Sequence, residues 1–407
     1  MRRAALVLSL AATALPLRAL GADRQGLTFQ EILALPAAPA DARVAYGPAP
    51  QQFGELWLPK GPGPHPVAIV IHGGCWSAEY GEAHIRPFCA ALPREGVAAW
   101  CLEYRRVGDE GGGWPGTFAD VARGADHLRQ IAAAHRLDLG RVISVGHSAG
   151  GHLALWLAGR SRLAASDPLR GKEPLALRGV VGLAPIPDLA RAASDRVCGD
   201  AVPALLDGPP AARPERYAAA SPIGLLPLGI PQEIVHGRED TIVPLRLSEA
   251  YVAAARAKGD AARLIAVDGA GHFDVIAPTS KAWHRVEDAV EDLAHAPPPT
   301  ARRDPPVGDR VGRTFLFDYG DLAIRVRYLS ESRLEWEQVK GPSAGLKGAE
   351  DYEATTVRPG VHFLWWQEKD ASVVTQVVDL ERRRVHTTWT SPDKKLNAFQ
   401  GKIVPQR

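Results

Sequence analysis

A serine stands at the centre of a glycine-rich turn between an apolar strand pattern and an apolar helix pattern. Residues 141–152 contain Gly146-His-Ser-Ala-Gly150, with Ser148 in the middle. A strand that enters a helix through so tight a turn leaves no room for side chains beside the serine, which suits glycine. The turn would lift the Ser148 hydroxyl above the sheet edge, near free N–H groups of the helix. An ordinary glycine-rich turn is the alternative, but the strand and helix on either side favour a nucleophile.

An acid and a base for this nucleophile follow two later strand patterns. Asp240 lies in an acidic turn after an apolar segment that begins at Glu233, and its neighbour Glu239 is the alternative acid. His272 lies on a glycine-rich loop directly after the apolar residues 263–267. A lone aspartate in a turn is usually only turn chemistry. With Ser148 upstream, however, His272 could remove the serine proton while Asp240 orients the imidazole.

Backbone N–H groups at a fourth strand end could bind a developing negative charge. The apolar run at residues 67–71 leads directly into His-Gly73-Gly74-Cys75. Glycines let a backbone approach a ligand closely and turn its N–H groups outward. We therefore predict an oxyanion hole formed by the N–H groups of Gly73, Gly74, Cys75 and Ala149.

Three bulky side chains near these motifs are candidates for a substrate pocket. They are Trp76, Tyr104 and His147, and ordinary packing in the core is the alternative for each. The sequence contains no CxxC or HExxH pattern, so neither a metal nor a cofactor is expected.

Strand and helix patterns alternate between these motifs. Strands are expected at residues 52–58, 97–104 and 179–184, and helices at residues 84–92, 118–135 and 248–258. Such alternation predicts a mostly parallel sheet with helices on both faces, preceded by an early antiparallel strand. The Ala/Pro-rich residues 185–222 are predicted to roof the site, and a plain connecting loop is the alternative.

The N-terminus has the order of a secretory signal peptide. Arg2 and Arg3 precede an apolar run that ends in small residues, which predicts a signal peptide over residues 1–22. A buried helix is the alternative, since the run is too short for a membrane span and no later segment is long enough. We expect a periplasmic or secreted protein, by either the general or the twin-arginine route. The net charge of +2, without a basic run, argues against a nucleic-acid partner.

Export would permit disulfide bonds among the four cysteines, Cys75, Cys89, Cys101 and Cys198. Pairing is not readable from a sequence. Cys89 and Cys101 flank one helix-to-strand connection, and they are the preferred pair.

The C-terminal quarter of the chain changes character. A chain of 407 residues favours two domains. Residues 296–306 form a Pro-rich linker, and residues 307–407 contain short alternating segments typical of an antiparallel barrel or sandwich. A small barrel can hold one apolar ligand. Four tryptophans could line its cavity or simply fill its core: Trp336, Trp365, Trp366 and Trp389.

The motifs of the first part resemble the α/β-hydrolase superfamily. The His72-Gly-Gly-Cys-Trp76 loop, the Gly146–Gly151 turn and the His236–Asp240 turn are similar to its esterase/lipase-like branch, which includes kynurenine formamidases, feruloyl-type esterases and prolyl-oligopeptidase-like hydrolases. The resemblance implies a catalytic domain over residues 23–295, in which Ser148, Asp240 and His272 cleave small carboxylic esters through an acyl-enzyme. Cys75 departs from the pattern, because related esterases have glycine or varied residues there.

Two alternatives to an esterase stay open. The same catalytic residues could cleave an amide, as an arylformamidase or an aminopeptidase-like hydrolase does. The second alternative rests on the tail, whose Arg358–Glu368 and Val377–Leu380 segments are similar to the MoaF-like calycins, small barrels that resemble lipocalins. If the barrel carries the function and the hydrolase-like part is inactive, the protein would be a non-catalytic binder of a small apolar ligand.

Overall fold

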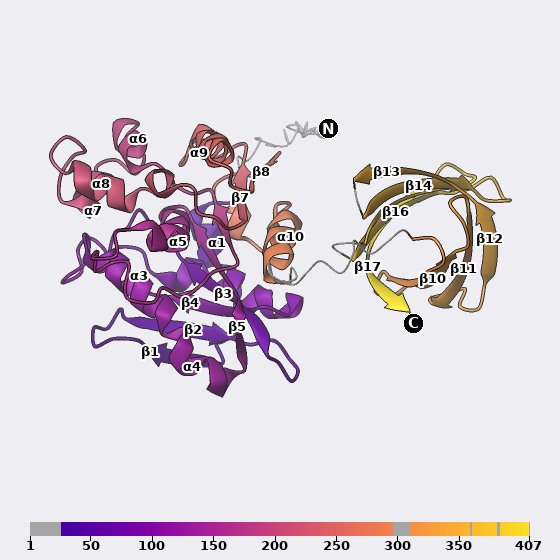
Figure 1. The fold of residues 1–407 in the computed structure, drawn as a ribbon, viewed down its shortest axis with the longest axis horizontal. Coiled ribbons are helices and arrows are strands. Elements are labelled where there is room, and N and C mark those ends of the chain that lie inside the picture. The colour runs from indigo at the N-terminus through magenta and orange to yellow at the C-terminus, as the bar shows by residue number, and fades with distance from the viewer. Residues whose placement is uncertain (1–25, 296–309, 359, 381–382, 407) are drawn as a thin grey trace, which may run out of the picture. The chain divides into compact units, whose positions relative to one another are not determined.

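The computed structural model describes residues 26–295, 310–358, 360–380 and 383–406. The predicted signal peptide (1–22) and Pro-rich linker (296–306) lie outside the described residues. The chain divides into two compact units between His295 and Ala296 (Figure 1). Each unit is described by itself.

A mostly parallel sheet of eight strands forms the centre of the first unit (Figure 1). Its order is β1-β2-β4-β3-β5-β6-β7-β8, and only β2 runs antiparallel to its neighbours. The expected α/β fold class is thereby confirmed. The strands are β1 (Ala42–Ala45), β2 (Phe53–Trp57), β3 (His65–Ile71), β4 (Ala98–Leu102), β5 (Leu137–His147), β6 (Gly179–Leu183), β7 (Gln232–Gly237) and β8 (Ala262–Val267).

Helices cover both faces of this sheet because its central strands are apolar on both sides. In β3, Val67, Ile69 and Ile71 enter one hydrophobic core, whereas Ala68 and Val70 enter the other. Such two-sided burial is typical of a parallel sheet. The first core includes α3 (Gly116–Asp126), α4 (Leu128–His135), α5 (Ala149–Gly159) and α9 (Leu245–Ala257). The second includes α1 (Phe29–Leu33), α2 (Arg86–Ala91) and α10 (Trp283–Ala294).

The helix expected over residues 118–135 is two helices in the structure. They are α3 and α4, which meet at His127. The N–H of Gln130 bonds to the carbonyl of His127, three residues back, at 2.9 Å. The chain therefore forms a tighter turn of the 3-10 type at this point. The spacing of apolar residues does not reveal such a local change.

The segment predicted as a roof contains short helices between β6 and β7. They are α6 (Leu189–Ser194), α7 (Ala201–Leu206), α8 (Pro214–Ala220) and the 3-10 turn η4 (Pro222–Leu225). Four other 3-10 turns occur in the unit: η1 (Glu82–His84), η2 (Leu92–Glu95), η3 (Arg160–Arg162) and η5 (Asp274–Ile276).

The second unit is a nearly closed antiparallel barrel of nine strands, in the order β12-β11-β10-β9-β17-β16-β15-β14-β13. This result confirms the predicted antiparallel architecture. The strands are β9 (Thr314–Asp318), β10 (Ala323–Tyr328), β11 (Arg333–Lys340), β12 (Lys347–Asp351), β13 (Glu353–Arg358), β14 (Val361–Gln367), β15 (Val373–Asp379), β16 (Arg384–Thr390) and β17 (Leu396–Gln406).

The four barrel tryptophans do not share one surface. Trp366 is buried, and Trp336 and Trp389 pack against the barrel core. Trp365 is 41% exposed, because successive side chains of β14 point to opposite faces. Trp365 therefore fits neither alternative considered from the sequence, a cavity lining or a place in the barrel core.

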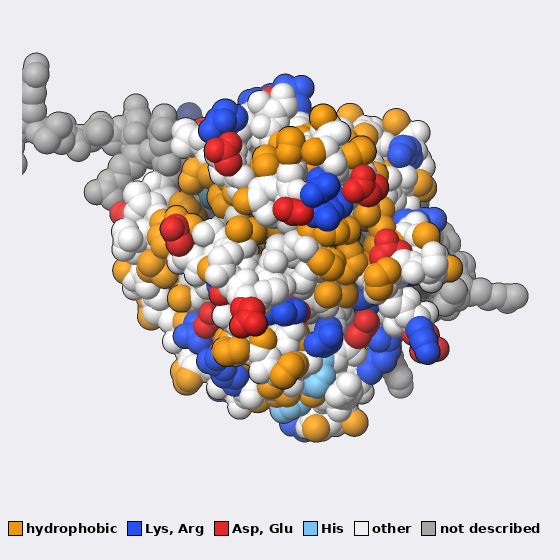
Figure 2. Space-filling model, turned by 90° about the vertical axis from the view of Figure 1, so that its left-hand side faces the viewer, with side chains coloured by type: hydrophobic (Ala, Val, Ile, Leu, Met, Phe, Trp, Pro, Cys, Tyr) orange, Lys and Arg blue, Asp and Glu red, His pale blue; other side chains and the backbone are white. Residues whose placement is uncertain are grey.

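The surface carries charges of both signs. On the face in Figure 2, Lys and Arg side chains are interspersed with Asp and Glu, and hydrophobic groups lie between them. Across the described ranges, no helix combines the length and apolar character that a membrane crossing requires.

Candidate active site

Ser148 lies at a strained turn between β5 and α5. Its backbone has φ 55° and ψ −120°, an uncommon conformation for a residue with a side chain. A Cβ at Gly146 would lie 2.1 Å from the carbonyl oxygen of Gly150, and a Cβ at Gly150 would lie 2.1 Å from that of Ile71. Both glycines are therefore required by close backbone contacts, as the sequence predicts.

Asp240 and His272 meet at the ends of neighbouring strands. His272 Nδ1 lies 2.6 Å from Asp240 Oδ2, and the Asp240 side chain has no exposed surface. The N–H groups of Ile242 and Val243 each donate to Asp240 Oδ1 at 2.8 Å. His236 Nε2 adds a contact of 3.2 Å to Oδ2. The carboxylate is thus fixed on both of its oxygens.

These partners keep the buried carboxylate ionised. Burial alone would raise the pKa of Asp240, but the hydrogen bonds from His236 and His272 outweigh burial and hold this pKa well below its usual range. An ionised Asp240 accepts the Nδ1 proton of His272, which leaves Nε2 of that imidazole as an acceptor.

The main chain of His272 is attached to the turn that carries Ser148. His147 Nε2 donates to the carbonyl oxygen of His272 at 2.9 Å, and the two rings lie 4.5 Å apart between centroids. On the other side, the Asp274 carboxylate accepts the N–H of Gly271 at 2.9 Å. Glu239 accepts the N–H of Ala270 at 2.9 Å, so Asp240 is the acid beside the histidine.

The glycine-rich loop after β3 lies directly against the turn that carries Ser148. A Cβ at Gly73 would lie 3.1 Å from the Cβ of Ser148 and 2.8 Å from the carbonyl oxygen of His147. Gly74 and Cys75 follow in left-handed conformations, with φ 104° and 51°. Ala149 is the first residue of α5, so its N–H has no acceptor within the helix. Of the four residues predicted to form an oxyanion hole, Gly73 and Ala149 therefore lie beside Ser148, and Gly74 and Cys75 continue the same loop.

A buried polar network lies behind this loop. His72 Nε2 lies 3.0 Å from Glu103, and the Tyr104 hydroxyl donates to the carbonyl oxygen of His72 at 2.9 Å. Burial would raise the pKa of Glu103, but His72, a hydrogen bond with the Glu82 side chain and Arg106 together lower it to about 2. Tyr104 is fully buried. Its hydroxyl braces the loop at His72.

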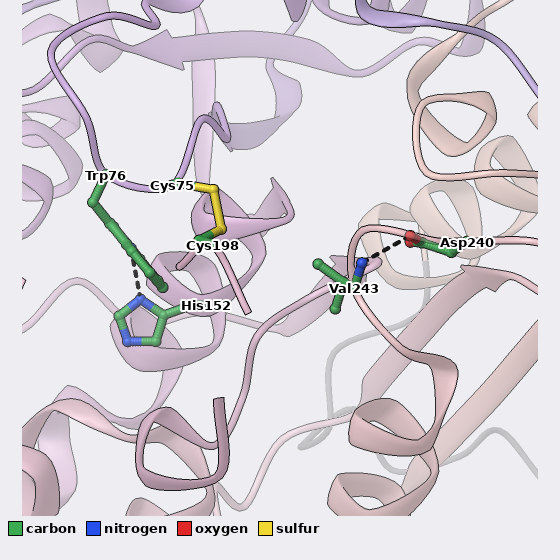
Figure 3. The surroundings of a disulfide bond; sticks show 6 residues. All are labelled: Cys75, Trp76, His152, Cys198, Asp240 and Val243. Carbon is green, nitrogen blue, oxygen red and sulfur yellow. Dashed lines mark hydrogen bonds between the residues drawn. A yellow bond between two sulfur atoms is a disulfide. The ribbon is translucent and has the colours of Figure 1, made fainter. Parts of the chain in front are cut away.

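Trp76 has a similar bracing role. Its indole Nε1 donates to His152 Nδ1 at 3.1 Å (Figure 3). His152 Nε2 donates to the carbonyl oxygen of Ala220 at 2.9 Å. An indole nitrogen can only donate, so His152 must be neutral with its proton on Nε2. Burial lowers the pKa of His152 to about 4. The pair joins the glycine-rich loop to α5 and to the end of α8.

The disulfide bond does not join the expected cysteines. It links Cys75 to Cys198, with 5.8 Å between their Cα atoms, whereas Cys89 and Cys101 are free thiols buried in the second core. A hydrogen bond with Cys89, together with burial, raises the pKa of Cys101. Sequence proximity misled the prediction, because the true partners are 123 residues apart and only the fold brings them together.

Two histidines that support the site had no role assigned from sequence. His236 precedes Asp240 by four residues in the acidic turn, and this spacing was a usable signal. For His152 there was no such signal, since its partners Trp76 and Ala220 are distant in the chain. Among the described side chains, no group of three His, Cys, Asp or Glu residues could hold a metal ion.

Two family models match separate parts of the chain. Residues 55–254 match the BD-FAE model, and residues 311–404 match the MoaF-like model. A probable isoprenylcysteine alpha-carbonyl methylesterase from Oryza sativa subsp. japonica is 24% identical over 284 residues, covering 66% of this chain and 67% of that protein. The esterase LipC from Mycobacterium tuberculosis is 30% identical over 257 residues, covering 58% of this chain and 60% of LipC.

Solved structures share the fold of the first unit. A truncated carbohydrate esterase from gut microbiota superposes with a TM-score of 0.55 at 21% identity, covering 64% of this chain and 99% of that one. An esterase from Thermogutta terrifontis superposes with a TM-score of 0.52 at 21% identity, covering 63% and 94% of the two chains. At these identities the likeness establishes the fold alone.

We expect Gly150→Ala to lower the free energy of unfolding by more than about 3 kcal/mol, because its Cβ would collide with the rigid carbonyls of Ile71 and His72. Urea unfolding followed by circular dichroism measures this loss. Gly140→Ala is the matched control, since its Cβ would meet only the movable Asp138 side chain. Equal midpoints for the two variants would contradict the packing argument.

We expect acid to destabilise the fold partly through His152. An unfolded histidine has a pKa of about 6.5, whereas folded His152 has a pKa of about 4. The unfolded state therefore binds an extra proton between these values, and stability falls as the pH falls from about 6.5 to about 4.

The test compares the urea midpoints of the parent and His152→Asn between pH 7.5 and 4.5. Asparagine retains an acceptor near the Nδ1 position and does not titrate. The variant should show a shallower pH dependence, by up to about 1.4 kcal/mol per pH unit. Parallel curves would show that His152 does not titrate in this way.

Proposed function

Residues 55–254 form an α/β-hydrolase domain of the BD-FAE family, and from this premise we propose that the protein is a serine hydrolase that cleaves small carboxylic esters. One observation carries the proposal. An ionised, buried Asp240 holds Nδ1 of His272 at 2.6 Å, and that histidine is attached through His147 to the turn of Ser148.

In this mechanism His272 acts first as a base. Its Nε2 takes the proton of the Ser148 hydroxyl as the oxygen attacks the substrate carbonyl. Asp240 keeps the imidazole in the required tautomer and stabilises its positive charge. His272 then returns the proton to the leaving alcohol, which leaves an acyl group on Ser148. Water, activated by the same histidine, releases the acid.

The charge that develops on the carbonyl oxygen needs donors that are already in position. The N–H groups of Gly73, Gly74, Cys75 and Ala149 serve this purpose in the proposal, because Gly73 packs against Ser148 and Ala149 begins α5. One such donor is worth roughly 3–4 kcal/mol in the transition state.

Esters are the favoured substrate class because both curated relatives are named as esterases. An aryl formamide or a peptide amide is the alternative, since the same groups would attack either carbonyl. His147 and Trp76 have almost no exposed surface, so other side chains around Ser148 are the better candidates for binding the acyl and alcohol portions.

We further propose that the protein is exported. The apolar segment after Arg2 and Arg3 supports this location, and so does the Cys75–Cys198 disulfide. Disulfides persist in oxidising compartments such as the periplasm.

A fluorophosphonate should add once to the parent protein and not to Ser148→Ala, as intact mass spectrometry will show. Asp240→Asn should lower kcat for 4-nitrophenyl acetate by about 10³- to 10⁴-fold, because the imidazole loses its orienting carboxylate. Glu239→Gln is the matched control and should retain parental activity, since glutamine still accepts from Ala270. A folded parent protein without an adduct would overturn the proposed function.

As a second, non-catalytic function, we propose that the barrel binds a small apolar molecule with one polar group. Its buried interior contains hydrogen-bonding side chains as well as aromatic rings. The Tyr319 hydroxyl lies 2.6 Å from Thr387 Oγ1, which also accepts from Gln376 Nε2 at 3.1 Å. Among the described residues, the Tyr328 hydroxyl and Gln376 Oε1 have no hydrogen-bond partner, so they remain for a ligand.

Binding of cis-parinaric acid to the full chain, followed by its fluorescence, tests this second function. Tyr328→Phe should weaken binding by up to about tenfold, the usual worth of one hydrogen bond. Trp365→Leu is the control, because its side chain lies outside the barrel. Equal affinities for both variants and the parent would exclude the interior site. If deletion of residues 307–407 leaves ester hydrolysis unchanged, the barrel does not deliver substrate.

A further inference from the structure

The disulfide bond joins the proposed oxyanion loop to the segment between β6 and β7. Cys75 directly follows Gly73 and Gly74, and Cys198 lies four residues after the end of α6. Figure 3 shows Cys75 and Trp76 on one loop, with the sulfur of Cys75 bonded to Cys198 and the indole directed at His152. The disulfide therefore involves a residue whose backbone N–H group would be one of the oxyanion-hole donors.

The loop has a conformation that a free chain would seldom adopt. Cys75 and Trp76 are adjacent non-glycine residues with φ 51° and 55°. Such conformations persist only where the surrounding structure imposes them. Trp76 has other anchors, since its indole bonds to His152 and its carbonyl accepts the N–H of Val107 at 2.8 Å. The side chain of Cys75 is anchored through its sulfur.

The segment at the other end of the disulfide is itself fixed. The Asp195 carboxylate accepts from Arg191 at 2.8 Å and from Arg246 at 3.0 Å. Arg246 lies in the first turn of α9, six residues after Asp240. The N–H of Val197 bonds to the carbonyl oxygen of Ala192 at 2.9 Å. Cys198 is therefore tied to the helix that follows the acid loop.

We propose that the Cys75–Cys198 disulfide is a positioning element of the active site, which holds the N–H groups of Gly74 and Cys75 toward the substrate oxygen. The bond ties the position of the loop at Cys75 to that of the segment after α6. This inference rests on the proposed serine-hydrolase function. Because these donors act on charge that appears only in the transition state, the bond should affect kcat more than KM.

The test removes the bond without altering the loop sequence. Cys198→Ser should lower kcat for 4-nitrophenyl acetate at least about tenfold and change KM by less than about threefold. Fluorophosphonate labelling of Ser148 should still occur, but more slowly. Dithiothreitol should lower the parent kcat in the same way, since it converts the partly exposed disulfide to two thiols as it is oxidised to a cyclic disulfide. It should not affect Cys198→Ser.

A purely structural disulfide would lower stability without this kinetic pattern. Val202→Ala is the matched control, because it truncates a buried side chain of α7 in the same segment and keeps the bond. Assays run well below the melting temperature of all variants. We expect Val202→Ala to keep the parental kcat.

Two results would overturn this inference while leaving the proposed function intact. The first is a kcat of Cys198→Ser within twofold of the kcat of a parent protein that is labelled and active. The second is a loss of kcat in Val202→Ala equal to that in Cys198→Ser. An unlabelled parent would overturn the proposed function and this inference together.

Discussion

The close approach of two backbones at the carboxyl end of the sheet is the constraint on which the site depends. The loop after β3 and the turn after β5 are in contact only because Gly73 and Gly150 have no side chains, and Gly146 lets the turn close against its own Gly150. A Cβ at any of these positions would meet a backbone atom at 2.8 Å or less. This contact places Gly73 beside Ser148. The geometry around Ser148 therefore depends on glycine at these positions.

Around this contact, buried polar groups determine protonation states. Asp240 accepts from two N–H groups and two histidines, so it is ionised although its side chain has no exposed surface. His147 and His152 show the opposite effect, because burial holds the pKa of each below the ordinary histidine value. The charge in this region is therefore concentrated on the Asp240–His272 pair, and low dielectric surroundings strengthen that interaction.

The local motifs could be predicted from sequence, whereas most of the contacts between them could not. The two glycines around Ser148 lie within five residues and directly indicate a turn without room for side chains. Asp240 and His272 each follow a strand that an apolar run makes evident. The sheet and the antiparallel second unit were predicted in the same way, from the apolar patterns of their strands. Other features depend on tertiary neighbours or on strand register, which one sequence does not contain. They are the Cys75–Cys198 bond, the Trp76–His152 contact and the roles of Tyr104 and Trp365.

The segment between β6 and β7 shows why such tertiary contacts are needed. Its helices α6, α7 and α8 have only six, six and seven residues, lengths at which an isolated helix is not stable in water. Side chains of α5 hold the end of α8, since His152 and Trp156 donate to successive carbonyls of Ala220 and Ala219. The disulfide holds the segment between α6 and α7 by closing a loop of 123 residues, a constraint worth roughly 4–5 kcal/mol in the chain-entropy model. A segment with little intrinsic helix stability is therefore held by α5 and bonded to the proposed oxyanion loop, so this segment and the Ser148 region share their supports.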